Sequence, residues 1–537
     1  MDDIKTKTSK TKAHNRMFDD VFDHVNQFSR YQALVYHGVN ALCIFPMALP
    51  YSNVLWAMGI PEYHCADSNT TCLPSECCHN CTSYAYDGPF FSTASEWNLI
   101  CEKAHFSAAV QMTMFVGMLF TAIVVGPLSD RFGRKICVFA SMAVLFLASL
   151  GSSFANSVWL FGSLRFLVGC GVLGVLLPQY THSLEILGPK LRTYGANMVE
   201  VFWITSAMLS LMVAYFIREW RTLLWVSSLS CLGLFPFYRV IPRSPRWLVA
   251  NGLLDEALEI LMKFGGKKDK PVDPVKLRAL LEEVRACQLA KEAKERHTPV
   301  DLYRTPKMRK WTAILSYNWF VTNLLTQAFY LFITSLAGNM YLNTLLMISV
   351  GYPFIPLVWF LQLRIGRRLT YAMFIILATC FCLMIIVTPT DNGMLITAFA
   401  ICGSAFTYGT YCLIYVMFAE LFPTVIRNTA LSTGSTVARL GNVLAPFMAT
   451  MAHLPGISLK LPIGIFAGLT LMAAIGTYWI PETKLAPMHQ TIEEAESAKD
   501  YYGMPCCGNS RVESRVETKI TGEDLTDIKS VSMDTRL

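Results

Sequence analysis

The segments EILGPKLR (residues 185–192) and ELFPTVIR (residues 420–427) decide the fold of this chain. Each begins with Glu and ends seven residues later with Arg, and the second copy follows the first by 235 residues. Gly133 in GPLSDRFGRK and Gly366 in RIGRR repeat with a similar offset of 233 residues. A charged box at matching places between long apolar runs predicts a duplicated membrane bundle, with a substrate held between its halves.

The composition also indicates a membrane protein. The 537 residues are 53% hydrophobic and only 15% charged, with a mean hydropathy of +0.40. We expect an all-α membrane protein with twelve transmembrane helices in two six-helix bundles, and no cleavable signal peptide because the first 30 residues are polar. The predicted spans are the apolar runs of roughly 20 residues that one membrane crossing needs: 32–58, 106–128, 136–156, 158–180, 194–216, 222–241, 311–334, 340–362, 370–389, 393–417, 429–451 and 462–480.

Basic residues predict which side faces the cytosol. They collect in alternate loops and in segments 1–16 and 261–310, whereas the opposite side carries little basic charge. The positive-inside bias therefore places both termini in the cytosol, in a multi-pass protein of the plasma membrane. The net charge of +7 belongs to these loops and gives no argument for a nucleic-acid partner. The loop residues are Arg131, Arg134, Lys135, Lys190, Arg192, Arg364, Arg367, Arg368 and Arg427.

The large loop 59–105 lies on the opposite side and combines cysteines with glycan acceptors. Asn69 and Asn80 stand in N-glycosylation sequons. This combination predicts an oxidised, extracellular, disulfide-stapled loop, with fifteen pairings open. Disulfides are favoured over a metal site in CCHNC (77–81), whose ligand spacing is irregular. The six cysteines are Cys65, Cys72, Cys77, Cys78, Cys81 and Cys101.

The chain should divide into two membrane bundles with cytosolic additions. The polar segment between the bundles has apolar residues at helical spacing, so we expect short helices that brace the bundle. The last three residues, Thr-Arg-Leu (535–537), could add as a strand to a PDZ domain. The expected parts are a cytosolic lead (1–31), a first bundle (32–252), a helical insert (253–310), a second bundle (311–485) and a flexible cytosolic tail (486–537).

The charged boxes are candidates for a cytosolic gate. Asp130, Arg131 and Arg134 fall at helix ends, within possible reach of Glu185 and Arg192 from the next inner loop. A partly desolvated network of this kind can hold the inner side closed and must break when it opens. The alternative is that these residues only set topology. The proposed gating residues are Asp130, Arg131, Gly133, Arg134, Glu185, Arg192, Arg367, Arg368, Glu420 and Arg427.

These boxes resemble known transporter signatures. GPLSDRFGRK is similar to the loop motif of the major facilitator superfamily, and the spacing Arg165-x-x-x-Gly-x-Gly is similar to its fourth-span element. The cysteine-rich loop ending SEWNLIC, together with SPRWLVANG (244–252) and ELFPTVIRNTALS (420–432), resembles the organic cation, anion and zwitterion transporter family over residues 20–485. Two departures stand out. The family usually has Glu before SPRWL where this chain has Arg243, and RIGRR lacks the Asp that Asp130 supplies in the first half.

Charged residues inside the predicted spans are candidates for substrate binding or coupling. Arg165, Glu200 and Arg439 are costly to bury and are therefore functional candidates. Arg439 lies ten residues into its span, about 15 Å deep. The resemblance implies Arg here in anion and zwitterion carriers and Asp in cation carriers, and a guanidinium can grip a carboxylate. Glu200 could pair with Arg439, bind a cationic group or carry a proton. Arg165 and His37 are candidates for scaffold or proton-coupling roles.

Aromatic residues are the remaining candidates. Tyr408, Tyr411 and Tyr415 share one helix face, where they could stack on an aromatic substrate or cage a quaternary ammonium. Tyr317 and Tyr330 add to this set from the seventh span. Each taken alone could instead face lipid or core.

The sequence thus predicts a secondary transporter of small organic anions or zwitterions, such as carnitine-like compounds, that works by alternating access. A cation carrier on the same scaffold and a transport-inactive sensor or scaffold glycoprotein are the alternatives. No Gly-x-Ser-x-Gly, His-Glu-x-x-His or Walker A motif occurs, so neither an enzyme nor ATP-driven transport is expected. No cofactor is expected, and the coupling ion, sodium or proton, stays open.

Overall fold

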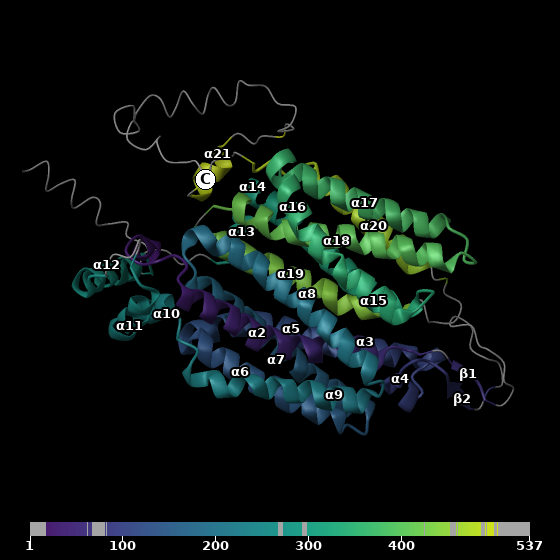
Figure 1. Ribbon diagram of the computed structural model, residues 1–537. Coiled ribbons are helices and arrows are strands. Elements are labelled where there is room, and N and C mark those ends of the chain that lie inside the picture. Colours follow the sequence, from purple (N-terminus) through teal and green to yellow (C-terminus); the bar gives the residue numbers. More distant parts are fainter. Residues whose placement is uncertain are drawn as a thin grey trace, which may run out of the picture.

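The computed structural model is a bundle of long helices lying side by side (Figure 1). It describes residues 18–61, 63–66, 81, 83–266, 272–292, 298–423, 425–451, 458, 460–484, 489, 491–498 and 502. Cys72, Cys77, Cys78, Asn69, Asn80 and the final Thr-Arg-Leu lie outside these residues.

The first half of the bundle runs from α2 to the 3-10 helix η5. Asn53 separates α2 from α3 within the first predicted span, and Pro46 and Pro50 stand inside α2 just before this break. A proline removes a backbone hydrogen bond, which favours such an interruption. The elements are α2 (Arg30–Ser52), α3 (Val54–Met58), α5 (Ala104–Phe132), α6 (Arg134–Ser153), α7 (Val158–Ile186), α8 (Arg192–Phe216), α9 (Trp220–Ser230) and η5 (Cys231–Arg239).

The second half repeats this order after the insert. Its eighth predicted span is divided at Val350 into α15 and α16. The elements are α14 (Pro306–Phe332), α15 (Met340–Ser349), α16 (Gly351–Ile365), α17 (Arg367–Val387), α18 (Gly393–Leu421), α19 (Arg427–Thr450) and α20 (Lys460–Thr477). Separate apolar cores fill the two halves, one around Phe161 and Leu173 and the other around Trp319 and Phe374.

Nine helical segments of the described residues are long and apolar enough to cross a membrane. The other three predicted spans are helical too, as α9 with η5, as α14 and as α19. Helices α14 and α19 contain more polar residues than the nine segments do. They pack against each other, and α19 also packs against α5 of the first half. The fold class is therefore that expected, a helical membrane bundle, and its less apolar helices lie where the two halves meet.

Short helices cover one end of the bundle, which we call the insert end (Figure 1). Helices α10 (Pro245–Ala250), α11 (Leu254–Phe264) and α12 (Pro274–Glu292) share an apolar core with the 3-10 helix η2 (Phe18–Asp23). Between η2 and this core, Asn26 donates from Nδ2 to the Phe264 carbonyl. We call these helices the brace, and residues 18–23 of the lead segment belong to it.

Two more short helices lie at this end of the second half. They are α13 (Asp301–Arg304) and α21 (Ile492–Ser497). Ala495 of α21 is buried, and Lys307 donates from Nζ to the carbonyls of Ala495 and Ala498. This part of the tail is therefore packed on the bundle, in contrast to the flexible tail that the sequence predicts. The apolar contacts of Ile492 and Ala495 supply the reason.

The opposite end, here the outer-loop end, carries the cysteine-rich loop. Strands β1 (Tyr63–Cys65) and β2 (Tyr84–Tyr86) pair antiparallel, with Tyr63 opposite Tyr86. A disulfide joins Cys65 to Cys81, so Cys81 is not available as a metal ligand. Cys101 is disulfide-bonded as well. The disulfide-stapled loop predicted from the sequence is confirmed for these residues.

A half-buried salt bridge fixes the end of this loop to the bundle. Glu96 on α4 (Thr93–Glu96) accepts from Nη2 of Arg221 at 2.6 Å and from Nε1 of Trp220 at 2.8 Å. Arg221 also donates to the carbonyls of Ser153 and Ala155. Burial alone would raise the pKa of the Glu96 carboxyl, but the Arg221 and Trp220 hydrogen bonds and the Arg221 charge hold it below its ordinary value.

We predict that Glu96→Gln lowers the free energy of unfolding by about 1–3 kcal/mol at neutral pH, because Arg221 loses its carboxylate partner. Since the pKa of Glu96 is lowered in the folded state, the stabilisation is present above the ordinary carboxyl pKa and is lost as the pH falls through the folded-state value. The difference between wild type and variant should therefore shrink towards acidic pH. Thermal unfolding in detergent between pH 3 and 8 measures it, and a constant difference would contradict this assignment.

Candidate functional site

The first charged box forms one network at the insert end of the first half. Arg134, at the start of α6, donates from Nη2 to Glu185 at 3.2 Å and lies 3.0 Å from Asp130. Its Nη1 donates to the Ser129 carbonyl at 3.2 Å. Glu185 also accepts from the hydroxyl of Ser244, the N-cap of α10, at 2.5 Å. The box thereby joins the loop between two spans to the brace.

The second half repeats this network except for the Asp130 contact, because Leu363 stands at the matching position. Arg367, at the start of α17, donates from Nη2 to Glu420 at 3.0 Å and from Nη1 to the Gln362 carbonyl at 3.2 Å. The other oxygen of Glu420 accepts from the Thr483 hydroxyl at 2.6 Å. Gln362 lies five residues before its arginine, as Ser129 does. The duplication inferred from the sequence therefore extends to individual hydrogen bonds.

The two glycines of the box open the helices that follow them. Gly133 has φ 93° and Gly366 has φ 98°, values that favour glycine because it has no Cβ. A Cβ on Gly366 would meet the Glu482 carboxylate at 2.5 Å, and one on Gly133 would meet the Trp247 ring at 3.2 Å. Both positions therefore require glycine on two counts, backbone conformation and space.

Several proposed gating residues have other partners than expected. Arg192 does not reach Glu185; it donates from both guanidinium nitrogens to Asp19 of η2 at 2.6 and 2.9 Å. The reason is that residues 18–23 fold against the brace and bring their own carboxylate. Arg131 lies over the Phe132 ring at 5.4 Å.

Among the proposed gating arginines of the second half, Arg368 makes its hydrogen bonds within that half. Arg368 donates to the carbonyls of Thr477, Tyr478 and Tyr502. Arg427 begins α19. The hydrogen bonds of Glu185 and Glu420 stay within one half, so these two networks hold each half together.

The centre of the bundle brings together oppositely charged side chains from the two halves. Glu200 on α8 accepts from the Tyr408 hydroxyl of α18 at 3.3 Å. Tyr411 and Tyr415, one and two turns further along α18, lie near both Glu200 and Arg439 of α19. The tyrosine rings follow each other at 6.3 and 5.6 Å. A row of tyrosines thus runs between an acid and a base.

Arg439 also faces the first half. It interacts electrostatically with Tyr51 of α2, and its Nε is buried with no hydrogen-bond partner among the residues that the structure describes. Glu200 likewise interacts with Tyr180 of α7. Sequence reasoning missed Tyr51 and Tyr180, which stand singly in apolar runs without any pattern that separates them from core tyrosines.

Other candidates lie away from this centre. Tyr317 donates to the Leu469 carbonyl of α20, so it packs inside the second half instead of facing the first. The rotation of α14, which the sequence does not fix, is the reason. The His37 ring packs edge-on against the Tyr36 ring, with 5.1 Å between the ring centres. Its centre lies 6.0 Å from that of the Phe202 ring.

Arg165 is fully buried on α7. Its three guanidinium nitrogens have no hydrogen-bond partner in the described part of the chain, and the group lies 5.8 Å from the Phe161 ring centre. No contact places it beside Glu200, Arg439 or the tyrosine row. Its geometry supports neither a substrate contact nor a particular ion pair.

Hydrogen bonds between the halves close the centre towards the outer-loop end. Tyr51 donates to Oε1 of Gln327 on α14 at 2.7 Å, and Tyr330 donates to the Ser52 carbonyl at 3.1 Å. Trp56 stacks on Tyr341 of α15 at 4.7 Å. Tyr330 is thus part of this contact and not of the tyrosine row.

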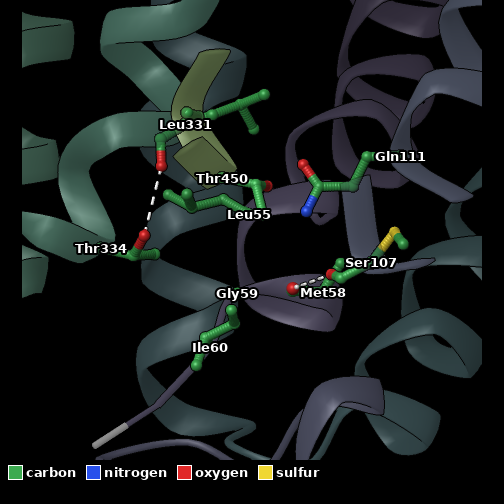
Figure 2. Close-up of a pocket in the computed structure, with 10 residues that line it drawn as sticks. Leu55, Met58, Gly59, Ile60, Ser107, Gln111, Leu331, Thr334 and Thr450 are labelled. Carbon is green, nitrogen blue, oxygen red and sulfur yellow. Dashed lines mark hydrogen bonds between the residues drawn. The ribbon is translucent and has the colours of Figure 1, made fainter. Parts of the chain in front are cut away.

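A small pocket lies beside this closure (Figure 2). Leu55, Met58 and Gln111 of the first half and Leu331 and Thr450 of the second half line it. Leu331 packs in the core of the first half. Little free space therefore separates the halves at this end.

Comparisons with known proteins agree with this architecture. Residues 62–495 match the family described as "Sugar (and other) transporter". The chain is 30% identical to the Drosophila melanogaster "Organic cation transporter protein", covering 89% of this chain and 94% of the relative. It is 32% identical to the "Solute carrier family 22 member 7" of Bos taurus, covering 84% and 81%. Among solved structures, the inward-open xylose transporter XylE from E. coli superposes with a TM-score of 0.60 at 16% identity, covering 86% of this chain and 98% of XylE.

A duplicated helical bundle with matching charged boxes and a central polar site is a membrane transporter of the major facilitator fold, and not an enzyme. The chain belongs to the sugar (and other) transporter family, within the group that contains the solute carrier family 22 proteins. The family resemblance drawn from the sequence is confirmed.

We predict that Tyr330→Phe loosens the closure at the outer-loop end, because the variant loses its hydrogen bond to the Ser52 carbonyl. One neutral hydrogen bond contributes about 0.5–1.5 kcal/mol, so the open population should rise about two- to tenfold. The measurement is the rate at which a membrane-impermeant maleimide labels the cysteine of a Thr450→Cys variant. Tyr63→Phe in the same background is the control for loss of a tyrosine hydroxyl elsewhere. If the labelling rate is unchanged and the KM for uptake rises, the prediction is wrong, and Tyr330 instead contacts the substrate.

Proposed function

We propose that the protein is a secondary transporter of small organic anions or zwitterions that works by alternating access. The observation that carries the proposal is the central site, in which Arg439 of the second half and Glu200 of the first half lie near the same tyrosines. Because each half contributes one charge, a substrate bound there contacts both halves.

The chemistry of the site favours a carboxylate ligand. Arg439 is half-buried and its buried Nε–H has no hydrogen-bond partner among the described residues, so a substrate carboxylate could accept from it in a charge-assisted hydrogen bond. Tyr411 and Tyr415 offer ring faces to an apolar or quaternary ammonium part, and Glu200 attracts a positive group. A zwitterion satisfies both charges at once, whereas a simple anion needs only Arg439.

A cation carrier is the second candidate. Glu200 and its hydrogen-bonded Tyr408 form a negative, aromatic surface that suits an organic cation. The name of the Drosophila relative points the same way. Against it stands Arg439, whose charge would repel a simple cation across the tyrosine row.

The direction of the chain in the membrane follows from its charges. We place the insert end in the cytosol, since the basic loops lie there, and the disulfide-containing loop outside the cell. Substrate then reaches the central site alternately from each side. The energy comes from an ion gradient or from exchange, and no nucleotide is consumed.

Arg439→Ala is expected to reduce uptake of a labelled aromatic carboxylate at least about a hundredfold, since a buried charge-assisted contact is lost. Arg439→Lys should recover only part, because an ammonium cannot bind a carboxylate bidentately. Uptake into oocytes, with surface protein measured in parallel, tests both. Arg309→Ala, an exposed arginine at the start of α14, is the matched control. Undiminished uptake by the Ala variant would overturn the site.

Glu200→Gln separates a zwitterion site from an anion site. We expect carnitine uptake to fall at least about tenfold while uptake of the aromatic carboxylate persists, because only the zwitterion needs the negative charge. The assay compares both substrates and tetraethylammonium, with and without sodium. Loss of tetraethylammonium uptake alone, with carnitine never transported, would favour the cation carrier.

A further inference from the structure

The charged networks of the two halves can be aligned residue by residue, and at one aligned position the charges have opposite signs. Arg243 directly precedes Ser244, the residue that donates to Glu185. Glu482 directly precedes Thr483, the residue that donates to Glu420. The same place in the network therefore holds a base in the first half and an acid in the second.

The acid of the second half binds the start of a helix. The Glu482 carboxylate accepts from the backbone N–H of Arg367 at 2.9 Å and from that of Arg368 at 3.2 Å. It is buried beside Gly366. A carboxylate there satisfies backbone donors that a helix leaves free at its N-terminus.

The first half presents the matching donors without an acid. Gly133 opens α6 as Gly366 opens α17, but among the described residues no side chain accepts from the backbone N–H of Arg134 or Lys135. Arg243 and Lys135 stand there instead, close enough to interact electrostatically as like charges. A small pocket lies between them, lined also by Trp247.

The cations of this pocket are incompletely paired. Arg243 makes one ion pair, from Nη1 to Glu256 at 3.2 Å, and both side chains are about 40% exposed. Lys135 has no carboxylate within salt-bridge distance in the described residues, and its Nζ lies 4.3 Å from the Tyr238 ring centre. Its counterpart Arg368, which lies over Tyr478, donates to three carbonyls. At this place in the network, the described residues leave incompletely paired cations and free backbone donors in the first half, whereas Glu482 occupies the matching donors of the second half.

The position of the pocket identifies the source of that anion. It opens at the start of α6, a membrane-crossing helix, and Phe132, Ile136 and Tyr238 around it are 41–47% exposed. Exposed apolar and aromatic groups beside cations suit the boundary between acyl chains and headgroups. We propose that this pocket, formed by Lys135, Arg243 and the start of α6, binds the phosphate of an anionic phospholipid in the cytosolic leaflet.

The test measures lipid binding by the purified full-length protein in detergent. Dioleoylphosphatidylglycerol is titrated while the midpoint of thermal unfolding is recorded, with dioleoylphosphatidylcholine and inorganic phosphate as the other two probes. Wild type should respond to phosphatidylglycerol. Arg243→Glu, which restores the acid found in the second half, should need about tenfold more lipid, and Lys135→Gln likewise.

Arg309→Glu makes the same change of charge at an exposed site in the other half and should titrate as wild type does. The midpoints without lipid show whether each variant is folded, and Arg243→Glu should be at least as stable as wild type because its carboxylate can cap α6. Equal lipid affinity of Arg243→Glu and wild type would overturn the proposal. An equal loss in Arg309→Glu, or an equal response to inorganic phosphate, would overturn it as well, in favour of bulk charge or of a free-anion site.

Discussion

The pairing of a helix-start arginine with a glutamate from the next loop is the interaction on which the architecture depends. Arg134 with Glu185 and Arg367 with Glu420 occupy the same place in the two halves and have the same secondary partners. Both glutamates are largely buried, and removing one partner of a buried pair costs about 3–5 kcal/mol. Each network also receives a hydroxyl from the segment beyond its sixth helix, and so holds the two ends of its half together.

Because the pattern repeats so closely, a difference between the halves at the same place in the network is informative. In the second half, Glu482 and the carbonyls around Arg368 satisfy the start of α17 from within the chain. In the first half, Arg243 pairs with the insert through Glu256, and no side chain of the described residues accepts from the N–H groups of Arg134 and Lys135 at the start of α6. Duplication therefore supplied a common frame, and the first half differs from it at the place where the brace and the membrane surface meet.

The sequence allowed the fold and part of the site to be predicted, for physical reasons. Glu185 and Glu420 could be found because the box repeats, and Glu200 and Arg439 because charges are rare in apolar runs. The interaction partners of individual side chains could not be predicted from the sequence in this way. Asp19 reaches Arg192 only because η2 packs on the brace, and Tyr317 and Tyr330 differ only through the rotation of α14. In the sequence, Glu482 is only one of several acidic residues after the last span. Its role at the start of α17 is visible only in the folded structure.

The distribution of these interactions bears on how the two halves can move. The charged networks lie within one half, whereas the described hydrogen bonds between halves are single contacts, namely Tyr51 with Gln327, Tyr330 with Ser52, Thr205 with Tyr352, and Tyr408 with Glu200. Three of the four join neutral groups, each contributing about 0.5–1.5 kcal/mol. The halves can therefore separate at a small cost while each keeps its buried ion pairs. Rocking as two rigid bodies around the central Glu200 and Arg439 is the motion that this distribution favours.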